Sequence, residues 1–309
     1  MKILSEAGLP GMAQGPVCLA IGVFDGVHLG HRAVIRQTLS EARRRGGAAV
    51  AITFDRHPAA IVAPDRKPPL LCPVWRKLEA LAQLGLDATV VYAFDESFSR
   101  QSAAQFVDRL RTGFGVLGSV TVGASFVFGH GRTGNLDELG RLGACHGFEV
   151  HGLPPVEISG EVVSSTRLRE LVANGEFDRA ATLLGRRHTL AGEVIQGDRL
   201  GRKLGFPTAN VDVDGLVLPP QGVYAGYAMW EGCRIPAAVN IGRRPTLDGS
   251  ISAIRVEAHL PGFEGDLYGR RMELDLHTRL RPEQKFPSLE ALVEQIGRDV
   301  AAVRVWSGN

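Results

Sequence analysis

The stretch from Ala20 to His31 constrains the fold more than any other part of the chain. It reads AIGVFDGVHLGH, an apolar run that turns through Asp25-Gly26 and opens an amphipathic segment at about Leu29. A buried strand, a glycine turn and a helix in this order place the helix N-terminus at the carboxyl end of the strand. Because the helix dipole there favours anions, the pattern predicts a phosphate site beside His28 and His31.

Apolar runs and helical patterns alternate along the first half of the chain. After a weakly specified lead-in at 1–16, we expect strands at 17–23, 48–54, 88–92, 119–122 and 148–153, and helices at 32–45, 74–84, 102–111, 136–146 and 167–173. Such alternation predicts an α/β domain, a doubly wound parallel sheet with helices on both faces. Ligands of such sheets bind beyond the carboxyl ends of the strands.

The pattern changes near residue 185. A short helix is expected at 176–184, and then come short β-like runs at 189–194, 211–213, 224–229, 234–241, 254–259 and 272–280, with no helical pattern before 289–303. Short strands separated by Gly and Pro, followed by one helix, predict a small antiparallel β-barrel with a terminal helix. A chain of 309 residues suits two domains, which we expect at 1–185 and 186–309.

Composition excludes several classes of protein. A net charge of +2 argues against nucleic acid as a partner. No signal peptide is recognisable, and no apolar run approaches the ~20 residues of a membrane span. The cysteines, Cys18, Cys72, Cys145 and Cys233, lack zinc or redox spacing. We therefore expect a cytoplasmic protein with reduced thiols and no membrane partner.

Two segments of the first half carry phosphate chemistry. In His28-Leu29-Gly30-His31, the glycine allows a triphosphate close to the backbone and the imidazoles can donate to it. The alternatives are a helix cap with ordinary histidines, or a His-x-x-His metal site for which no third ligand is nearby. Ser164-Ser165-Thr166-Arg167 is a second clamp, or else a plain N-cap. The pair is typical of nucleotidyltransferases that carry a His-x-Gly-His motif.

The second half has its own candidates. The loop at 201–210, GRKLGFPTAN, can wrap phosphates, with Thr208 and Asn210 as oxygen ligands for Mg²⁺; the alternative is a Gly-Pro turn between two strands. In the alternating segment at 255–259, Glu257 shares a face with Arg255 and His259 if Val256 and Ala258 face the other way. Glu257 is then a candidate general base for an alcohol, or an exposed strand glutamate.

These motifs together resemble one family, the bacterial bifunctional riboflavin kinase/FMN adenylyltransferases, also called FAD synthetases. The resemblance runs from about Val17 to Val303. Its motifs lie at 22–31, 53–58, 122–129 and 164–169, and then at 205–210, 222–224, 239–246, 266–269 and 280–281. Nine ordered motifs make chance agreement implausible.

For the first domain, the resemblance implies transfer of AMP from ATP to FMN, giving FAD and pyrophosphate. His28 and His31 are then the catalytic residues that stabilise the ATP phosphates. The implied ATP-binding residues are Gly22, Phe24, Asp25, Gly30, Ser164, Thr166 and Arg167, and the implied flavin-binding residues are His57, Pro58 and Ser125.

For the second domain, the resemblance implies phosphorylation of riboflavin to FMN with Glu257 as catalytic base. The implied ATP-binding residues are Gly201, Lys203, Gly205, Pro207, Thr208 and Asn210, with Mg²⁺ held by the last two; the implied flavin-binding residues are Tyr268, Leu280 and Arg281. The expected partners are small molecules, with ATP as co-substrate and riboflavin, FMN and FAD as substrates and products, bound by a monomer or weak homo-oligomer.

One residue departs from the family pattern. Ser125 stands where the family has Asp or Asn before the phenylalanine of its Gly-x-x-Phe segment. The alternative is therefore a riboflavin kinase whose first domain is weakly active or only binds nucleotide. A flavin-sensing binding protein is disfavoured because Glu257, Thr208 and Asn210 are all present, and a binder has no need of a base.

Overall fold

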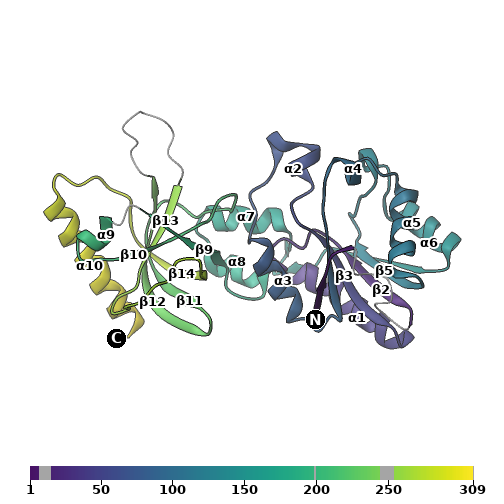
Figure 1. Cartoon of the computed structure of the whole chain (residues 1–309), viewed down its shortest axis with the longest axis horizontal. Coiled ribbons are helices and arrows are strands. Elements are labelled where there is room, and N and C mark those ends of the chain that lie inside the picture. Colours follow the sequence, from purple (N-terminus) through teal and green to yellow (C-terminus); the bar gives the residue numbers. More distant parts are fainter. Residues whose placement is uncertain (7–14, 198–199, 244–253, 309) are drawn as a thin grey trace. The chain divides into compact units, whose positions relative to one another are not determined.

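The computed structural model describes residues 1–6, 15–197, 200–243 and 254–308 (Figure 1). In the first part of the chain the helices and strands are β1 (Lys2–Leu4), β2 (Val17–Ile21), α1 (Leu29–Arg45), β3 (Ala48–Phe54), α2 (Ala59–Val62), η2 (Pro64–Arg66), α3 (Val74–Ala82), β4 (Ala88–Tyr92), α4 (Glu96–Ser99), α5 (Ala103–Phe114), β5 (Leu117–Gly123), η3 (His130–Arg132), α6 (Leu136–His146), β6 (Glu149–Leu153), β7 (Glu157–Ile158), β8 (Glu161–Val162), α7 (Ser165–Ala173) and α8 (Phe177–Leu184).

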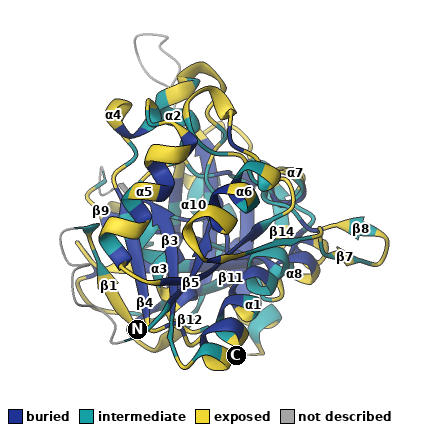
Figure 2. Ribbon diagram, turned by 90° about the vertical axis from the view of Figure 1, so that its right-hand side faces the viewer, coloured by how far each residue is buried: buried dark blue, intermediate teal, exposed yellow. Residues whose placement is uncertain are grey.

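The expected parallel sheet is confirmed. Six strands pair in the order β1-β4-β3-β2-β5-β6, and every pair is parallel. Alternate residues of the strands enter different cores: Leu19 and Ile52 pack with α5 and α6, whereas Ala20 and Ala51 pack with α1 and α3. The central strands β2, β3, β4 and β5 are accordingly mostly buried between helices on the two faces of the sheet (Figure 2).

The expectation of a weakly specified lead-in at 1–16 is wrong in one respect, because Lys2–Leu4 forms β1, the edge strand beside β4. A strand of three residues is too short to show an alternating pattern, and Ile3 is exposed at the edge. Residues 7–14 of this lead-in lie outside the described residues.

The strand order reverses between β2 and β5. From β2 the chain builds the sheet outward through β3 and β4, and then returns to the other side of β2 with β5 and β6. Ligands of open α/β sheets bind at such a switch point, outside the carboxyl ends of the two strands. Gly22 follows one of these ends and Ala124 follows the other.

The second part of the chain forms the expected barrel with its terminal helix. Its elements are β9 (Thr189–Ile195), α9 (Leu200–Lys203), β10 (Thr208–Val211), β11 (Gly222–Trp230), β12 (Cys233–Arg243), β13 (Ile254–His259), β14 (Arg271–Pro282) and α10 (Leu289–Ser307). All neighbouring strands are antiparallel, and the pairing of β9 with β10 closes the barrel in the order β10-β13-β12-β11-β14-β9.

Two expectations for the second part need correction. The strand expected at 211–213 runs instead over Thr208–Val211, because Thr208 and Asn210 pair with β13 directly after Pro207. A one-turn helix, α9, also precedes the terminal helix. None of the helices in the described ranges combines the length and the apolar character needed to cross a membrane.

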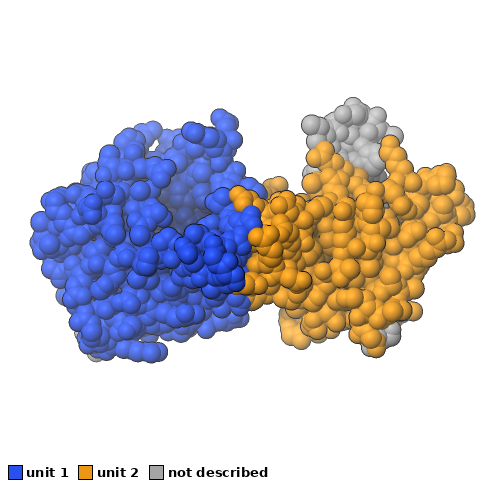
Figure 3. Space-filling model, turned by 180° about the vertical axis from the view of Figure 1, so that it is seen from behind, with its two compact units in different colours: residues 1–168, 183–185 blue, residues 169–182, 186–309 orange. Residues whose placement is uncertain are grey.

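Contacts between residues divide the chain into two units (Figure 3). The first contains Met1–Leu168 and Leu183–Gly185, and the second contains Arg169–Thr182 and Arg186–Asn309. The chain thus crosses the division within α7, near the end of α8, and between Gly185 and Arg186.

Helix α10 packs against β11 and β12 of the barrel through a small apolar cluster and one buried ion pair. Val303 and Trp306 contact Ala225 on β11. The Arg281 guanidinium donates to both carboxylate oxygens of Asp299, with Nη2 2.8 Å from Oδ2 and Nε 3.1 Å from each oxygen. Asp299 is only 6% exposed, so this fork attaches the helix to the end of β14.

Removing Asp299 should loosen the helix from the barrel. We expect Asp299→Ala to lower the free energy of unfolding by about 3 kcal/mol, because it leaves the Arg281 guanidinium unpaired in a half-buried position. Urea unfolding followed by Trp230 and Trp306 fluorescence in a Trp75→Phe background measures this. Arg298→Ala, which breaks an exposed pair with Glu294 on the same helix, is the matched control and should change little.

Candidate active sites

The turn that follows β2 has a strained backbone. Phe24 and Val27 have φ values of 52° and 46°, in a backbone region that residues other than glycine rarely adopt. Gly26 has a φ of 79°. Phe24 and Val27 are almost fully buried, so apolar packing contributes to holding them. The buried Asp25 carboxylate accepts the Leu71 N–H at 2.9 and 3.1 Å, which fixes the turn from one side.

Both histidines of the motif lie at the start of α1. His28 is the N-cap: its Nδ1 accepts the His31 N–H at 3.3 Å, so the neutral ring carries its proton on Nε2. The two rings stack with centroids 3.6 Å apart, and His31 meets the edge of Phe24 at 5.3 Å. A Cβ on Gly30 would lie 3.1 Å from the His28 ring, so a side chain there would require the ring to shift.

The second expected phosphate segment contacts the first. The Ser165 hydroxyl donates to the Asp25 carbonyl at 3.0 Å and so joins α7 to the strained turn. Ser164 caps α7 by accepting the Arg167 N–H at 3.2 Å, while the Arg167 guanidinium pairs with Glu161 of β8. Thr166 is exposed. The two clamps predicted from sequence therefore come together, with Ser165 as a contact that sequence reasoning missed.

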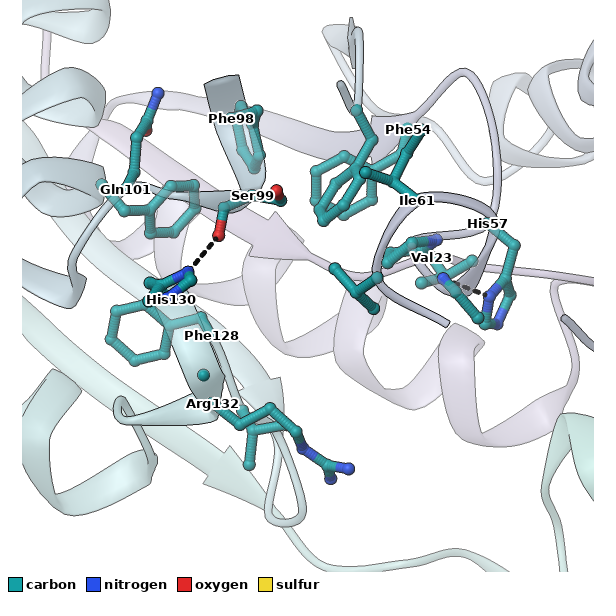
Figure 4. Close-up of a pocket in the computed structure, with 18 of the residues that line it drawn as sticks. Val23, Phe54, His57, Ile61, Phe98, Ser99, Gln101, Phe128, His130 and Arg132 are labelled. Atoms are coloured by element: carbon teal, nitrogen blue, oxygen red, sulfur yellow. Dashed lines mark hydrogen bonds between the residues drawn. The ribbon is translucent and has the colours of Figure 1, made fainter. Parts of the chain in front are cut away.

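A cavity of about 1110 Å³ lies at the carboxyl ends of the strands (Figure 4). Four of the residues expected in the first domain line it: Gly22, His57, Pro58 and Ser125. A local hydrogen bond orients the His57 ring, whose Nδ1 accepts the Ala59 N–H at 3.1 Å. Ser125 is exposed and follows β5, at the switch point of the sheet.

Sequence reasoning missed the aromatic wall of this cavity. Six phenylalanines line it and contact one another in a continuous series, with ring centroids 5.2–6.0 Å apart: Phe54, Phe94, Phe98, Phe106, Phe128 and Phe126. They come from four separate segments, and each alone is indistinguishable from an ordinary core residue. Such a wall suits a flat aromatic ligand.

A histidine and two arginines lie among the polar lining. His130 is tied to the chain opposite, with Nδ1 3.2 Å from the Ser99 carbonyl oxygen, and Arg132 adopts a φ of 60° (Figure 4). Among the described residues, the Arg132 side chain has no carboxylate partner. Arg100, by contrast, pairs with Glu96 at 3.0 Å. Arg132 is therefore a cation available to an anionic ligand.

Asp55 lies directly after β3 and braces the wall. Burial alone would raise the pKa of this carboxyl, but hydrogen bonds from the Phe94 N–H and the Arg56 guanidinium outweigh burial and lower it. An ionised Asp55 thus fixes the start of the segment that carries Phe94.

The second unit arranges its candidates in one row across the barrel. The register pairs Glu257 of β13 with Asn210 of β10 on one side and with Asn240 of β12 on the other. The row continues from Asn240 to Val223 and from Val223 to Arg281. Val256 and Ala258 enter the barrel core, so Glu257 lies on the outer face, as the alternation predicted.

The loop at 201–210 packs closely around β10. The Phe206 N–H donates to the Gly201 carbonyl at 2.8 Å, and a Cβ on Gly201 would meet Phe206 O at 2.4 Å and Thr208 Oγ1 at 3.3 Å. Gly205 has a φ of 85°, and Lys203 and Pro207 are exposed. His259 reaches the Pro207 carbonyl oxygen from β13, with Nδ1 2.8 Å away. Residues 244–246 of the motif at 239–246 lie outside the described residues.

The expected flavin residues of the second unit lie at two places. Leu280 and Arg281 are at the end of β14 beside α10, and Leu280 is the extra residue of a bulge opposite Val223. Tyr268 is exposed before the start of β14. Since a strand rises about 3.3 Å per residue, the 12-residue β14 separates them by roughly 35 Å along the strand.

Comparison with known proteins gives this geometry its context. The family model for FAD synthetase matches residues 12–167, and the model for riboflavin kinase matches residues 184–307. The bifunctional riboflavin kinase/FMN adenylyltransferase of Pseudomonas fluorescens is 40% identical, covering 93% of this chain and 92% of its own. This chain belongs to that family.

The family assignment holds over the whole chain. The enzyme of the same description from Escherichia coli K12 is 36% identical, covering 100% of this chain and 98% of its own. A crystal structure described as a macrolide-efflux protein from Streptococcus pneumoniae has the same fold, with a TM-score of 0.80, 25% identity and coverage of 98% and 99%. The chain is thus a bifunctional enzyme: an N-terminal FAD synthetase domain adenylylates FMN, and a C-terminal riboflavin kinase domain makes FMN. ATP, riboflavin and FMN are the substrates of this family.

A substitution of Gly30 tests the packing of the histidines in the FAD synthetase domain. We expect Gly30→Ala to displace the His28 ring from its stack with His31 and to lower FAD formation from FMN and ATP about tenfold or more. Formation of FMN from riboflavin should be unchanged. Chromatography of both reactions measures this, with Gly140→Ala on α6 as control, because a Cβ there meets nothing. Unchanged FAD formation would contradict the packing argument.

Proposed function

We propose that the cavity of the first unit holds the isoalloxazine ring of FMN, while the start of α1 holds the phosphates of ATP. The observation that carries this proposal is the wall of contacting phenylalanines in the cavity at the sheet's switch point. Gly22 lines the same cavity, and the turn that leads to His28 follows Gly22 directly. A flat aromatic ring stacks well on such a wall, and an anion is favoured at a helix N-terminus.

The reaction then needs positioning rather than covalent help. An oxygen of the FMN phosphate attacks the α-phosphorus of ATP in line, the bond to the bridging oxygen breaks, and pyrophosphate leaves. We propose that His28 and His31 donate to the phosphate oxygens as negative charge develops on them. Helix α1 has no acidic residue in its first turn that would repel this charge.

We assign the closing role to the start of α7. Ser164 and Thr166 offer hydroxyls, and Arg167 exchanges its partner Glu161 for a phosphate. The Ser165 contact with the Asp25 carbonyl holds this segment at the strained turn. Gly22, Phe24, Asp25 and Gly30 act by shaping the backbone that the nucleotide approaches.

In the kinase unit we propose Glu257 as the base that accepts the proton of the riboflavin 5′-hydroxyl. Its strand neighbours Asn210 and Asn240 flank it with amide groups. Thr208, Asn210 and Glu257 together offer neutral and anionic oxygens, the donor type that Mg²⁺ takes, so the residues fit this ion. Bound Mg²⁺ would neutralise phosphate charge, and the exposed Lys203 would add a further cation. The backbone of Gly201, Gly205 and Pro207 would line the ATP phosphates beside it.

Arg281 and Leu280 lie in the row of Glu257, three strands away, or about 14 Å at roughly 4.8 Å per strand. We propose that they hold the flavin ring beside α10, with its ribityl chain directed along the row toward Glu257. We assign Tyr268 a weaker role as a flavin contact, because it lies at the other end of β14.

We further propose 1–185 and 186–309 as the working domains and a monomer or weak homo-oligomer as the active form. Small molecules are the partners that the proposed chemistry requires. The cysteines are all free thiols, which supports a reducing compartment such as the cytoplasm.

Two substitutions should separate the activities. Glu257→Gln removes the base and should lower FMN formation from riboflavin at least about a hundredfold, with FMN-to-FAD conversion unchanged. His31→Ala should do the reverse. Chromatography of flavins and pyrophosphate release measure both reactions, and Glu193→Gln on the exposed face of β9 is the control for Glu257. Loss of both reactions in either variant would argue against independent sites.

Arg132 should recognise the FMN phosphate or another electron-rich group of FMN. We expect Arg132→Gln to raise the KM for FMN about tenfold, because a charge-assisted hydrogen bond is lost, with the KM for ATP nearly unchanged. Arg111→Gln removes an exposed arginine of α5 outside the cavity and is the matched control. A rise of the KM for ATP alone would assign Arg132 to the nucleotide instead, and an equal rise of both KM values would contradict selective recognition of FMN.

A further inference from the structure

Lys77 is a buried lysine that no step of the proposed mechanism uses. It lies on α3 and is only 7% exposed. Its Nζ lies 2.9 Å from Thr53 Oγ1, 2.9 Å from the Phe54 carbonyl oxygen and 3.2 Å from the Val23 carbonyl oxygen. Lysine is almost never buried without partners, so a group held this way has a specific role.

The hydrogen-bond partners of Lys77 suit an ammonium. The Thr53 hydroxyl donates its proton to the Val23 carbonyl at 3.0 Å, so toward Lys77 it can only accept. Three acceptors therefore surround Nζ, and an ammonium has three protons where a neutral amine has two. Burial lowers the pKa of Lys77, while the nearby Cys72, Asp25 and Asp55 act in the opposite direction. The geometry is that of a charged ammonium.

The three acceptors lie where the site begins. Thr53 and Phe54 end β3, and Val23 follows β2 directly before the strained Phe24. Val23 and Phe54 both line the cavity. One ammonium thus joins the carboxyl ends of two central strands, at the floor of the cavity and at the entry to the turn that carries His28. A backbone held in an unfavourable region persists only where surrounding contacts over-determine it.

We propose that Lys77 is a positioning residue for adenylyl transfer: its ammonium holds the ends of β2 and β3 so that the turn at 24–27 presents His28 and the cavity wall presents Phe54. This rests on the proposed roles of the histidines and the cavity. Lys77 acts through these groups and does not itself contact substrate. All three donors of Lys77 are used on Thr53 and Phe54 at the end of β3 and on Val23 just after β2.

The central test is Lys77→Met, which keeps the length of the side chain but removes the charge and all three donors. We expect kcat for FAD formation from FMN and ATP to fall about tenfold to a hundredfold, the scale of an ångström's misplacement of reacting groups. Riboflavin phosphorylation by the same molecules should be unchanged. Lys77→Arg retains charge and donors and should recover part of the loss. Lys67→Met makes the same chemical change at an exposed site and should match the parent.

A merely structural role makes a different prediction. It would lower the melting temperature and leave kcat per folded molecule unchanged, so kcat is measured well below the melting transition. The fluorescence of Trp75 in a Trp230→Phe, Trp306→Phe background reports whether α3 is folded. A folded Lys77→Met that keeps kcat within about twofold overturns the proposal.

If Lys77→Met does not fold, Thr53→Val removes one acceptor with little change of shape. It should lower the same kcat about threefold to tenfold, and an unchanged kcat would again overturn the proposal. His31→Ala is assayed in parallel. Full activity of His31→Ala would contradict the proposed role of the histidine, whereas a loss there with an unaffected Lys77→Met would contradict only the role of Lys77.

Discussion

The adenylyltransferase site that we propose depends on the polar groups that hold the turn between β2 and α1. Phe24 and Val27 adopt backbone angles that cost free energy, and the chain cannot keep them by local preference alone. The Asp25 carboxylate holds the turn through the Leu71 N–H, and the Lys77 ammonium holds the strand ends before it. Because these groups are buried, losing one partner leaves the other unsatisfied in a medium that cannot solvate it. The position of His28 follows from these contacts.

The two units build their sites in different ways, for reasons that lie in their sheets. An open parallel sheet leaves a crevice where the strand order reverses, so the site that we propose for the first unit lies beyond the ends of β2 and β5. A small barrel fills its interior with side chains, so chemistry must use its outer face or its ends. Glu257 accordingly lies on the outside, in a cross-strand row with Asn210 and Asn240.

Much of the fold could be predicted because its signals are local. Strand β3 runs from Ala48 to Phe54 and α6 from Leu136 to His146, as periodicity predicted. The outward position of Glu257 followed from alternation with two small apolar neighbours. Strand β1 was missed because three residues show no period, and β10 was shifted because Pro207 suggested a turn where pairing with β13 decides. Lys77 could not be predicted, since its helix pattern also suits a solvent-exposed lysine.

The sequence by itself determined the order of most strands and helices and the motifs that identify the family. Only the tertiary structure decided which distant residues meet. The phenylalanine wall draws on four segments, and the Ser165 contact with Asp25 joins residues 140 positions apart. The physical reason is that backbone preference and periodicity act over a few residues. Cavities, cross-strand rows and buried ion contacts arise instead from how the elements pack, and packing depends on residues from all parts of the chain.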